Sequence, residues 1–230
     1  MTRRDFISSG ASLVAGAAVG EPIRSNLGGR TPISEGEGLP YDSEIEYLES
    51  TGTQYIDTGI LVGEDVRVDC TFELMAYGNT CVFGGRSSNV LNSLAVWAYE
   101  ASYKIRFDLI GQDFTGQPLV YTITPNLGHE YFVSKYGKRN FLGGVEQASN
   151  STINYIPSKS CYLFAMNNGG AASFIGHLRI KRFSISGLRD MIPVRFTNEH
   201  GIVEGAMYDR VSGGLFRNQG TGSFIIGPDI

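Results

Sequence analysis

Cysteine, histidine and tryptophan are scarce in this sequence of 230 residues, which contains three, three and one of them. The cysteines, Cys70, Cys81 and Cys161, are odd in number and show no CxxC spacing. This argues against a zinc site and against a fully paired disulfide framework. We expect the cysteines to be buried as small apolar residues, with at least one free thiol.

Charge is also sparse, at 18% of residues with a net charge of −4, and the basic residues are scattered. The chain therefore lacks the basic stripe that a nucleic-acid partner requires. Thirty glycines against eight prolines, with thirteen Phe and twelve Tyr, favour strands joined by tight turns. The length predicts one globular domain with a short appendage, large enough to fold without a metal or disulfide.

The N-terminal segment, residues 1–20, has its own character. Arg3 and Arg4 are adjacent, Phe6 follows, and a weakly apolar stretch without acids continues to residue 20. This resembles a twin-arginine export signal, which implies a periplasmic, cell-surface or extracellular protein. The stretch is too short to span a bilayer, so no stable membrane span is expected after export. The alternative is an amphipathic or disordered N-terminus with two arginines by chance. Residues 21–43 are predicted to be a disordered linker.

The body of the chain, residues 44–230, alternates in polarity. Apolar residues occupy every second position from 66 to 74 and again from 103 to 109, with polar residues between them. Similar short runs lie at 90–99, 119–124, 130–136, 161–166, 174–185, 191–196 and 202–208. Glycine-rich turn signals separate the runs, and no segment is typical of a long amphipathic helix. The pattern predicts an all-β fold, a two-sheet antiparallel β-sandwich of the jelly-roll type.

Several motifs in this body resemble one family. Residues 46–59, EYLESTGTQYIDTG, form its opening, residues 163–165 and 174–180 a middle strand pair, and residues 192–195, 205–209 and 216–228 its closing strands. Together they resemble laminin G-like, concanavalin A-like domains of bacterial surface and phage structural proteins. The resemblance implies a non-catalytic binding module, with glycans as the expected ligand. The alternative is a structural or adhesion protein that binds protein partners in a surface or virion-like assembly.

Glycan binding needs an aromatic platform beside polar groups that read hydroxyls. The candidate ligand-binding residues are Trp97, Tyr99, Lys104, Arg106, Asp108, His177 and Arg179. If their strand faces share the concave side of the sandwich, they form one polar groove with aromatic flanks. The alternative places Trp97 in the core between the sheets.

Catalysis has weaker support in the sequence. Glu44, Glu46 and Glu49 approximate the E-x-D-x-x-E spacing of glycosidases of this fold, but a solvated edge strand explains the same letters. The three histidines have no accompanying G-x-S-x-G elbow. We therefore expect no enzyme activity and no catalytic residues.

No cofactor is expected either, with calcium as the one candidate. Laminin G-like and lectin relatives often hold this ion with Asp and Asn oxygens. Asp108, Asn167 and Asn168 are the weak candidates for such ligands, although no dense acidic loop supports them.

Overall fold

The computed structural model describes residues 38–87, 91–99, 104–112, 119–151 and 154–230. The chain divides into residues 1–35 and 36–230, and the fold concerns the second unit alone. The predicted signal residues Arg3, Arg4 and Phe6 and almost all of the predicted linker lie outside the described residues.

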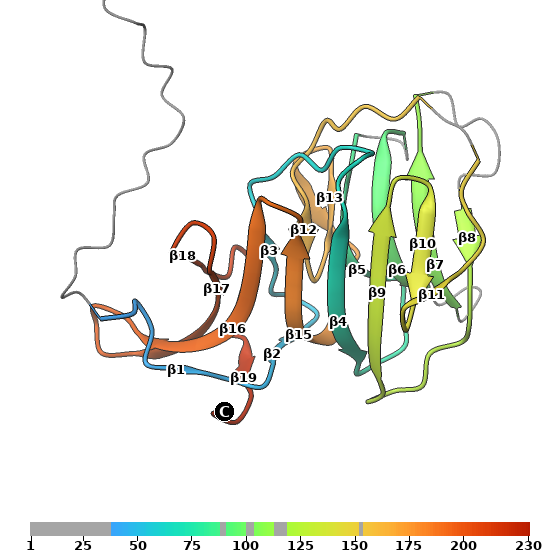
Figure 1. Ribbon diagram of the computed structural model, residues 1–230. Helices are drawn as coiled ribbons and strands as arrows, with labels where there is room; N and C mark the ends of the chain where they lie inside the picture. Colours follow the sequence, from blue (N-terminus) through green and yellow to red (C-terminus); the bar gives the residue numbers. More distant parts are fainter. Residues whose placement is uncertain (1–37, 88–90, 100–103, 113–118, 152–153) are drawn as a thin grey trace, which may run out of the picture. The chain divides into compact units, whose positions relative to one another are not determined.

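The described residues form two sheets and no helix, with β9, β4, β15 and β16 side by side in front of the smaller sheet (Figure 1). The larger, eleven-stranded sheet has the order β11-β10-β9-β4-β15-β16-β17-β18, with β1, β2 and β19 attached to it. Its strands are β1 (Ser43–Glu44), β2 (Leu48–Thr51), β4 (Val68–Leu74), β9 (Glu130–Tyr136), β10 (Arg139–Leu142), β11 (Val145–Glu146), β15 (His177–Ile185), β16 (Arg189–Thr197), β17 (Val203–Asp209), β18 (Gly214–Phe216) and β19 (Ile225–Ile226).

The smaller sheet has eight strands in the order β14-β13-β5-β6-β7-β8, with β3 and β12 attached. Its strands are β3 (Ile56–Asp57), β5 (Thr80–Arg86), β6 (Ser93–Tyr99), β7 (Lys104–Ile110), β8 (Leu119–Tyr121), β12 (Tyr162–Leu163), β13 (Met166–Asn168) and β14 (Ala171–Ser173). Every pair in both sheets is antiparallel except β13 with β5 among the described strands. The predicted all-β, two-sheet sandwich is confirmed.

The core lies between the sheets and is built by the alternation seen in the sequence. Phe72 of β4 and Phe107 of β7 are fully buried, as are the apolar residues two positions away on each strand. Phe83 of the smaller sheet meets Phe183 of the larger sheet edge-on, with ring centres 5.5 Å apart. Aromatic pairs of this kind contribute beyond their buried area, so they join the two layers.

Strand β5 is the main element that the sequence pattern missed. Gly84 and Gly85 are a glycine pair of the kind that predicts a turn, yet both lie in the strand and are buried. A Cβ on Gly84 would lie 2.6 Å from the Cβ of Ala95, and one on Gly85 would lie 2.8 Å from the carbonyl oxygens of Lys159 and Ser160. The glycines are therefore required by close approach of neighbouring chain segments.

Gly84→Ala should accordingly lower the free energy of unfolding by about 1 to 3 kcal/mol, because the added methyl overpacks a closed site. Gly78→Ala is the matched control, since the nearest atom to its added Cβ is 3.7 Å away on a side chain. Urea denaturation of both variants measures the difference. Equal stability of the two would show that β5 can shift to admit the methyl.

The three cysteines are buried and free, as expected. Cys70 and Cys81 belong to different sheets rather than to one hairpin. Burial raises the pKa of all three thiols, Cys161 included. The thiolate form is thereby suppressed, which makes these cysteines unreactive packing residues.

Candidate functional site

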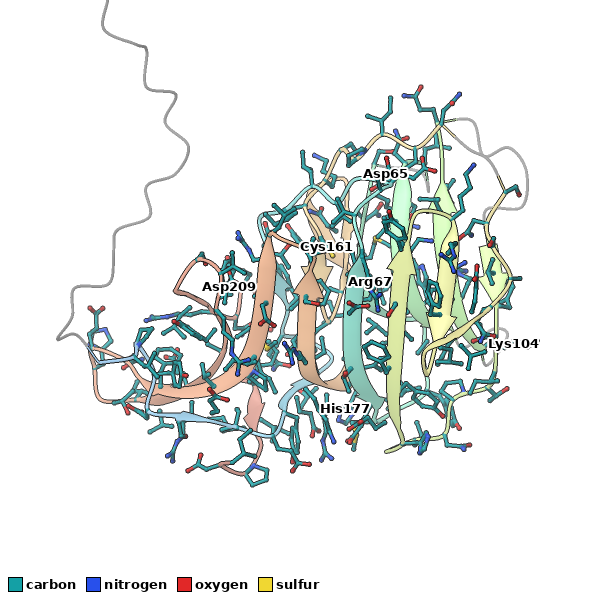
Figure 2. The ribbon with its side chains drawn as sticks, in the orientation of Figure 1. Asp65, Arg67, Lys104, Cys161, His177 and Asp209 are labelled. Carbon is teal, nitrogen blue, oxygen red and sulfur yellow. The ribbon has the colours of Figure 1, made fainter. Side chains whose placement is uncertain are left out.

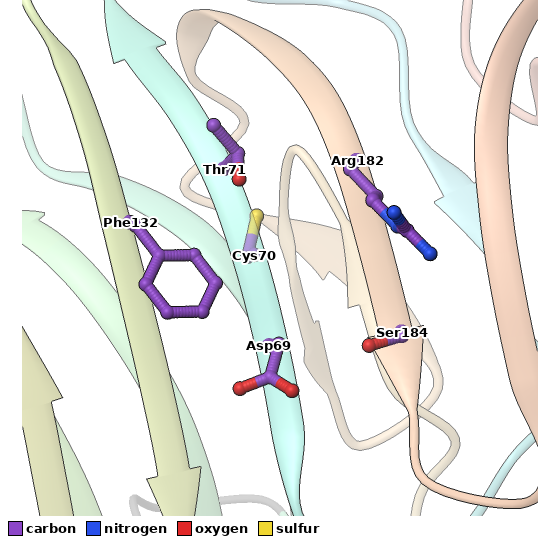
Figure 3. Close-up of a pocket in the computed structure, with 6 residues that line it drawn as sticks. All are labelled: Asp69, Cys70, Thr71, Phe132, Arg182 and Ser184. Atoms are coloured by element: carbon purple, nitrogen blue, oxygen red, sulfur yellow. The ribbon is translucent and has the colours of Figure 1, made fainter. Parts of the chain in front are cut away.

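A polar cavity opens on the outer face of the larger sheet, across strands β15, β4 and β9 (Figure 3). Its volume is about 220 Å³, and its lining residues are Asp69, Cys70, Thr71, Phe132, Arg182 and Ser184. Alternation along β4 explains the polarity, because Cys70 and its apolar neighbours face the core while Asp69 and Thr71 face outward.

A β-bulge in β15 completes this cavity. The pairing of β15 with β4 shifts between Ile180 and Arg182, so that Arg182 lies opposite Thr71 and Ser184 opposite Asp69. Without the shift, Phe183 would point outward instead of into the core. The bulge thus buries Phe183 and presents Arg182 to the cavity, a common use of bulges.

Hydrogen bonds hold the polar side chains of the cavity in place. Asp69 accepts from the Ser134 hydroxyl and from Arg67 Nε, the latter at 2.9 Å. Arg67 Nη2 also donates to Ser134 Oγ at 3.2 Å. Arg182 pairs with Asp190 at 3.0 Å while its side chain stays 58% exposed. The cavity therefore has fixed acceptors on one side and a solvent-accessible guanidinium on the other.

A second cavity, of about 560 Å³, continues on the same face of the larger sheet, where Figure 2 labels Arg67 and Asp65. Its lining residues are Asp65, Val66, Arg67, Tyr136, Arg139, Phe141 and Ser186. Arg67 lines the second cavity and donates a hydrogen bond to Asp69, which lines the first. We call the combined surface the outer-face groove. Along β9, Phe132 and Tyr136 face it with 38% and 45% of their surfaces exposed.

A charged network borders the groove where β15 begins, and it contains two of the predicted site residues. His177 Nε2 lies 3.0 Å from Glu49 Oε1, and Arg179 bonds Glu49 at 2.6 Å and Glu73 at 3.2 Å. Burial alone would raise the pKa of Glu73, but hydrogen bonds from Lys181 and Arg179 outweigh it and lower that pKa. His177 and Arg179 are thus engaged within the protein.

The other predicted ligand-binding residues lie on the smaller sheet. Lys104, at the start of β7, is exposed, whereas Trp97 and Asp108 are buried. Figure 2 labels Lys104 and His177 far apart in the view. The side chain of Tyr99 lies outside the described part of the structure. The condition for one shared groove is not met, because β6 and β7 belong to one sheet and β15 to the other.

Trp97 forms a small cluster on the outer side of the smaller sheet. Its Nε1 donates to Asp108 Oδ2 at 2.6 Å, and the Arg106 guanidinium lies 4.7 Å from its ring centre. Phe174 packs its ring edge-on at 5.2 Å. The predicted wet face of β7 is therefore covered at Arg106 and Asp108, and Trp97 also lies outside the core between the sheets. Desolvation raises the pKa of Asp108 against the opposing effects of Arg106 and Trp97.

The three candidate calcium ligands do not converge on one site. Asp108 lies on β7, and β5 and β6 separate that strand from Asn167 and Asn168 on β13. Asn167 Oδ1 accepts from the Gly170 amide at 2.9 Å, and Asn168 Oδ1 accepts from Arg86 Nε at 3.0 Å. Across the described ranges no three His, Cys, Asp or Glu side chains gather as a metal site.

The acidic motif near the domain start places Glu44 on β1, Glu49 on β2 and Glu46 between the two strands. Glu44 accepts from the Tyr41 hydroxyl, Glu46 pairs with Lys181, and Glu49 is 5% exposed within the charged network. The expectation of a solvated edge strand is wrong for Glu49, because β2 is paired on both sides. Strand β19 pairs with the side of β2 that the sequence pattern predicted to be solvated.

No model of a known protein family and no curated protein matches the chain. Among solved structures, full-length tailspike protein 2 of Escherichia coli O157:H7 bacteriophage CAB120 is 13% identical over 66% of this chain, with a TM-score of 0.37. A second structure, NanB plus Optactamide, is 12% identical over 84% of this chain, with a TM-score of 0.42. This chain spans 27% and 39% of those proteins. The laminin G-like resemblance stays a prediction. No helix among the described residues is long and apolar enough to cross a membrane.

Proposed function

We propose that this chain is an exported, non-catalytic binding module that holds glycans in the outer-face groove. The observation that carries the proposal is Phe132, an aromatic ring left 38% exposed between Thr71 of the next strand and the wider groove. A cavity that combines an exposed aromatic ring with a few fixed polar groups has the composition of a ligand site.

Glycan chemistry matches the composition of the groove. The apolar face of a sugar ring stacks on an aromatic side chain, and its hydroxyls pair with planar polar groups. Phe132 and Tyr136 supply the rings, while Asp69 on β4 supplies an acceptor and Arg182 on β15 supplies a donor. These groups are held by internal hydrogen bonds, so little side-chain entropy is lost on binding.

The way in which the nearby acids are engaged supports a role without catalysis. Glu49 and Glu73 share Arg179, and Glu73 also pairs with Lys181 at 2.7 Å. The hydrogen bonds that lower the pKa of Glu73 keep it ionised, whereas a glycosidase acid must hold a proton near neutral pH.

Phe132→Ala and Tyr136→Ala should each weaken glycan binding about tenfold, or ~1.4 kcal/mol. A glycan array followed by calorimetry on the best ligand measures this. Tyr121→Ala is the matched control, because Tyr121 is 42% exposed on the smaller sheet, away from the groove. Full binding by Phe132→Ala, or equal loss in Tyr121→Ala, would place the glycan elsewhere.

The second candidate is an adhesion or structural module that binds a protein partner. It is favoured by the free edge of the larger sheet at β11, where Val145 is 65% exposed next to the groove. Sheet edges of this kind accept an added strand. An array without glycan binding, joined to capture of an envelope protein that Val145→Asp abolishes, would support this candidate.

A further inference from the structure

Lys135 is a buried amine in the space between the sheets. It follows Tyr131 and Val133 on the inner face of β9 and is 1% exposed. Its Nζ donates to Asn140 Oδ1 and to Asn150 Oδ1, each at 2.9 Å. Among the described residues it forms hydrogen bonds to these amides and no ion pair. A buried lysine whose partners are neutral has neither water nor an opposite charge to stabilise its protonated form.

The amine is therefore a nucleophile near neutral pH. Burial lowers the pKa of Lys135 to about 7, with the charges of Asp108 and Glu64 offsetting part of that effect. Near pH 7 a large fraction of the Nζ atoms then carries a free electron pair. Desolvated lysines activated in this way attack carbonyl carbons.

Asn150 presents the more polarised of the two carbonyl groups. Its Oδ1 accepts from Lys135 Nζ and also from Asn140 Nδ2 at 3.0 Å. When Nζ turns from this oxygen to attack Cγ, the Asn140 Nδ2 donor remains to stabilise the negative charge that develops on Oδ1. Asn140 is itself fixed, because Nδ2 also donates to the carbonyl oxygens of Lys138 and Ala148. The Cγ of Asn150 lies only one C=O bond, about 1.2 Å, beyond the oxygen that Nζ already contacts.

We propose that Lys135 and Asn150 become joined by an amide bond within the folded domain. The Nζ electron pair attacks Asn150 Cγ, the Nζ–Cγ bond forms, and the Cγ–Nδ2 bond breaks. One proton passes from Nζ to the departing nitrogen, which leaves as ammonia, so no oxidant or cofactor is needed. Asn140 is a positioning residue that donates to the oxygen. The link closes residues 135–150 into a loop that holds β10 and β11, the outermost strands of the larger sheet, against β9.

Mass spectrometry of a tryptic digest of the purified full-length chain tests this directly. Trypsin does not cleave after a lysine whose Nζ is acylated, so in the linked chain cleavage after Arg106, Lys138, Arg139 and Lys159 leaves residues 107–138 joined to residues 140–159. The proposal predicts this one branched peptide, lighter by one ammonia than the sum of those two segments, with fragments that place the branch at Lys135 and Asn150. Two separate, unmodified peptides would overturn it, and this measurement needs no variant.

Variants separate the link from other ammonia losses. An asparagine that cyclises on its own backbone also loses ammonia but leaves the peptides unjoined, and that outcome, like a branch at Asn140, would overturn the assignment. Lys135→Arg should abolish the branch. Asn140→Asp keeps the shape of the side chain, removes the Nδ2 donor to Asn150 Oδ1, and adds a carboxylate that keeps Nζ protonated. Formation of the link should therefore be roughly a hundredfold slower. Unchanged linking in Asn140→Asp would remove its positioning role. Glycan binding in the outer-face groove is measured separately and does not depend on this result.

Discussion

Arg106→Met is expected to lower the free energy of unfolding at neutral pH by about 3 to 5 kcal/mol. Arg106 Nε lies 2.8 Å from Asp108 Oδ1, and both side chains are largely excluded from water. Removing the guanidinium leaves a buried carboxylate with the Trp97 N–H as its main remaining donor. Urea denaturation at several pH values measures the loss.

The control for that variant is the double change Arg106→Met with Asp108→Asn. It removes the charge while the amide oxygen still accepts from Trp97, so most of the lost stability should return. The direction in which the stability deficit changes with pH follows from the pKa of Asp108. Burial already raises the pKa of Asp108, and loss of Arg106 raises it further, so the folded state binds the extra proton. The deficit should therefore shrink as pH falls toward the ordinary aspartate pKa of 3.8. A pH-independent deficit would assign the loss to packing of Arg106 on Trp97.

Phe183→Ala should cost about 3 to 5 kcal/mol of stability, the usual result for a buried phenylalanine. Phe183 is fully buried and meets Phe83 of the opposite sheet, so its removal opens a cavity between the layers. Differential scanning calorimetry or urea denaturation measures the effect.

Phe132→Ala is the matched control, because it removes the same side chain from the outer face of the same sheet. Its stability should change by no more than about 0.5 kcal/mol while its glycan binding falls. Phe183→Ala should show the opposite pattern at a temperature where it stays folded. Similar stability losses in the two variants would contradict the arrangement in which the bulge of β15 turns Phe183 inward and the alternation of β9 turns Phe132 outward.

Strand alternation made the layer architecture predictable. Strand β9 was expected at 130–136 and is found there, and β4 and β7 begin within two residues of their expected starts. Periodicity reports only which side of a strand is apolar. It could not recover β5, because Gly84 and Gly85 are required by neighbouring segments rather than by a turn.

The candidate site was less predictable for a related reason. Alternation along β7 predicts that Arg106 and Asp108 point away from the core. It does not reveal that Phe174 and Arg86, which lie outside β6 and β7, cover Trp97. The sequence did not reveal the cavity at Phe132, because its lining residues come from three strands, β4, β9 and β15. A bulge without a sequence signature brings β15 into register with β4. Phe132 and Tyr136, two aromatic residues four positions apart on the predicted outer face of β9, were the one available signal.

The placement of β2 bears on how this domain acquires its shape during synthesis. Leu48 pairs with Ile180 on one side and Ile226 on the other, and Glu49 meets His177 across 128 positions of sequence. Contacts between such distant segments slow folding. A ribosome must deliver β15 before β2 finds its first neighbour and β19 before it finds the second, so this part of the larger sheet forms late in synthesis.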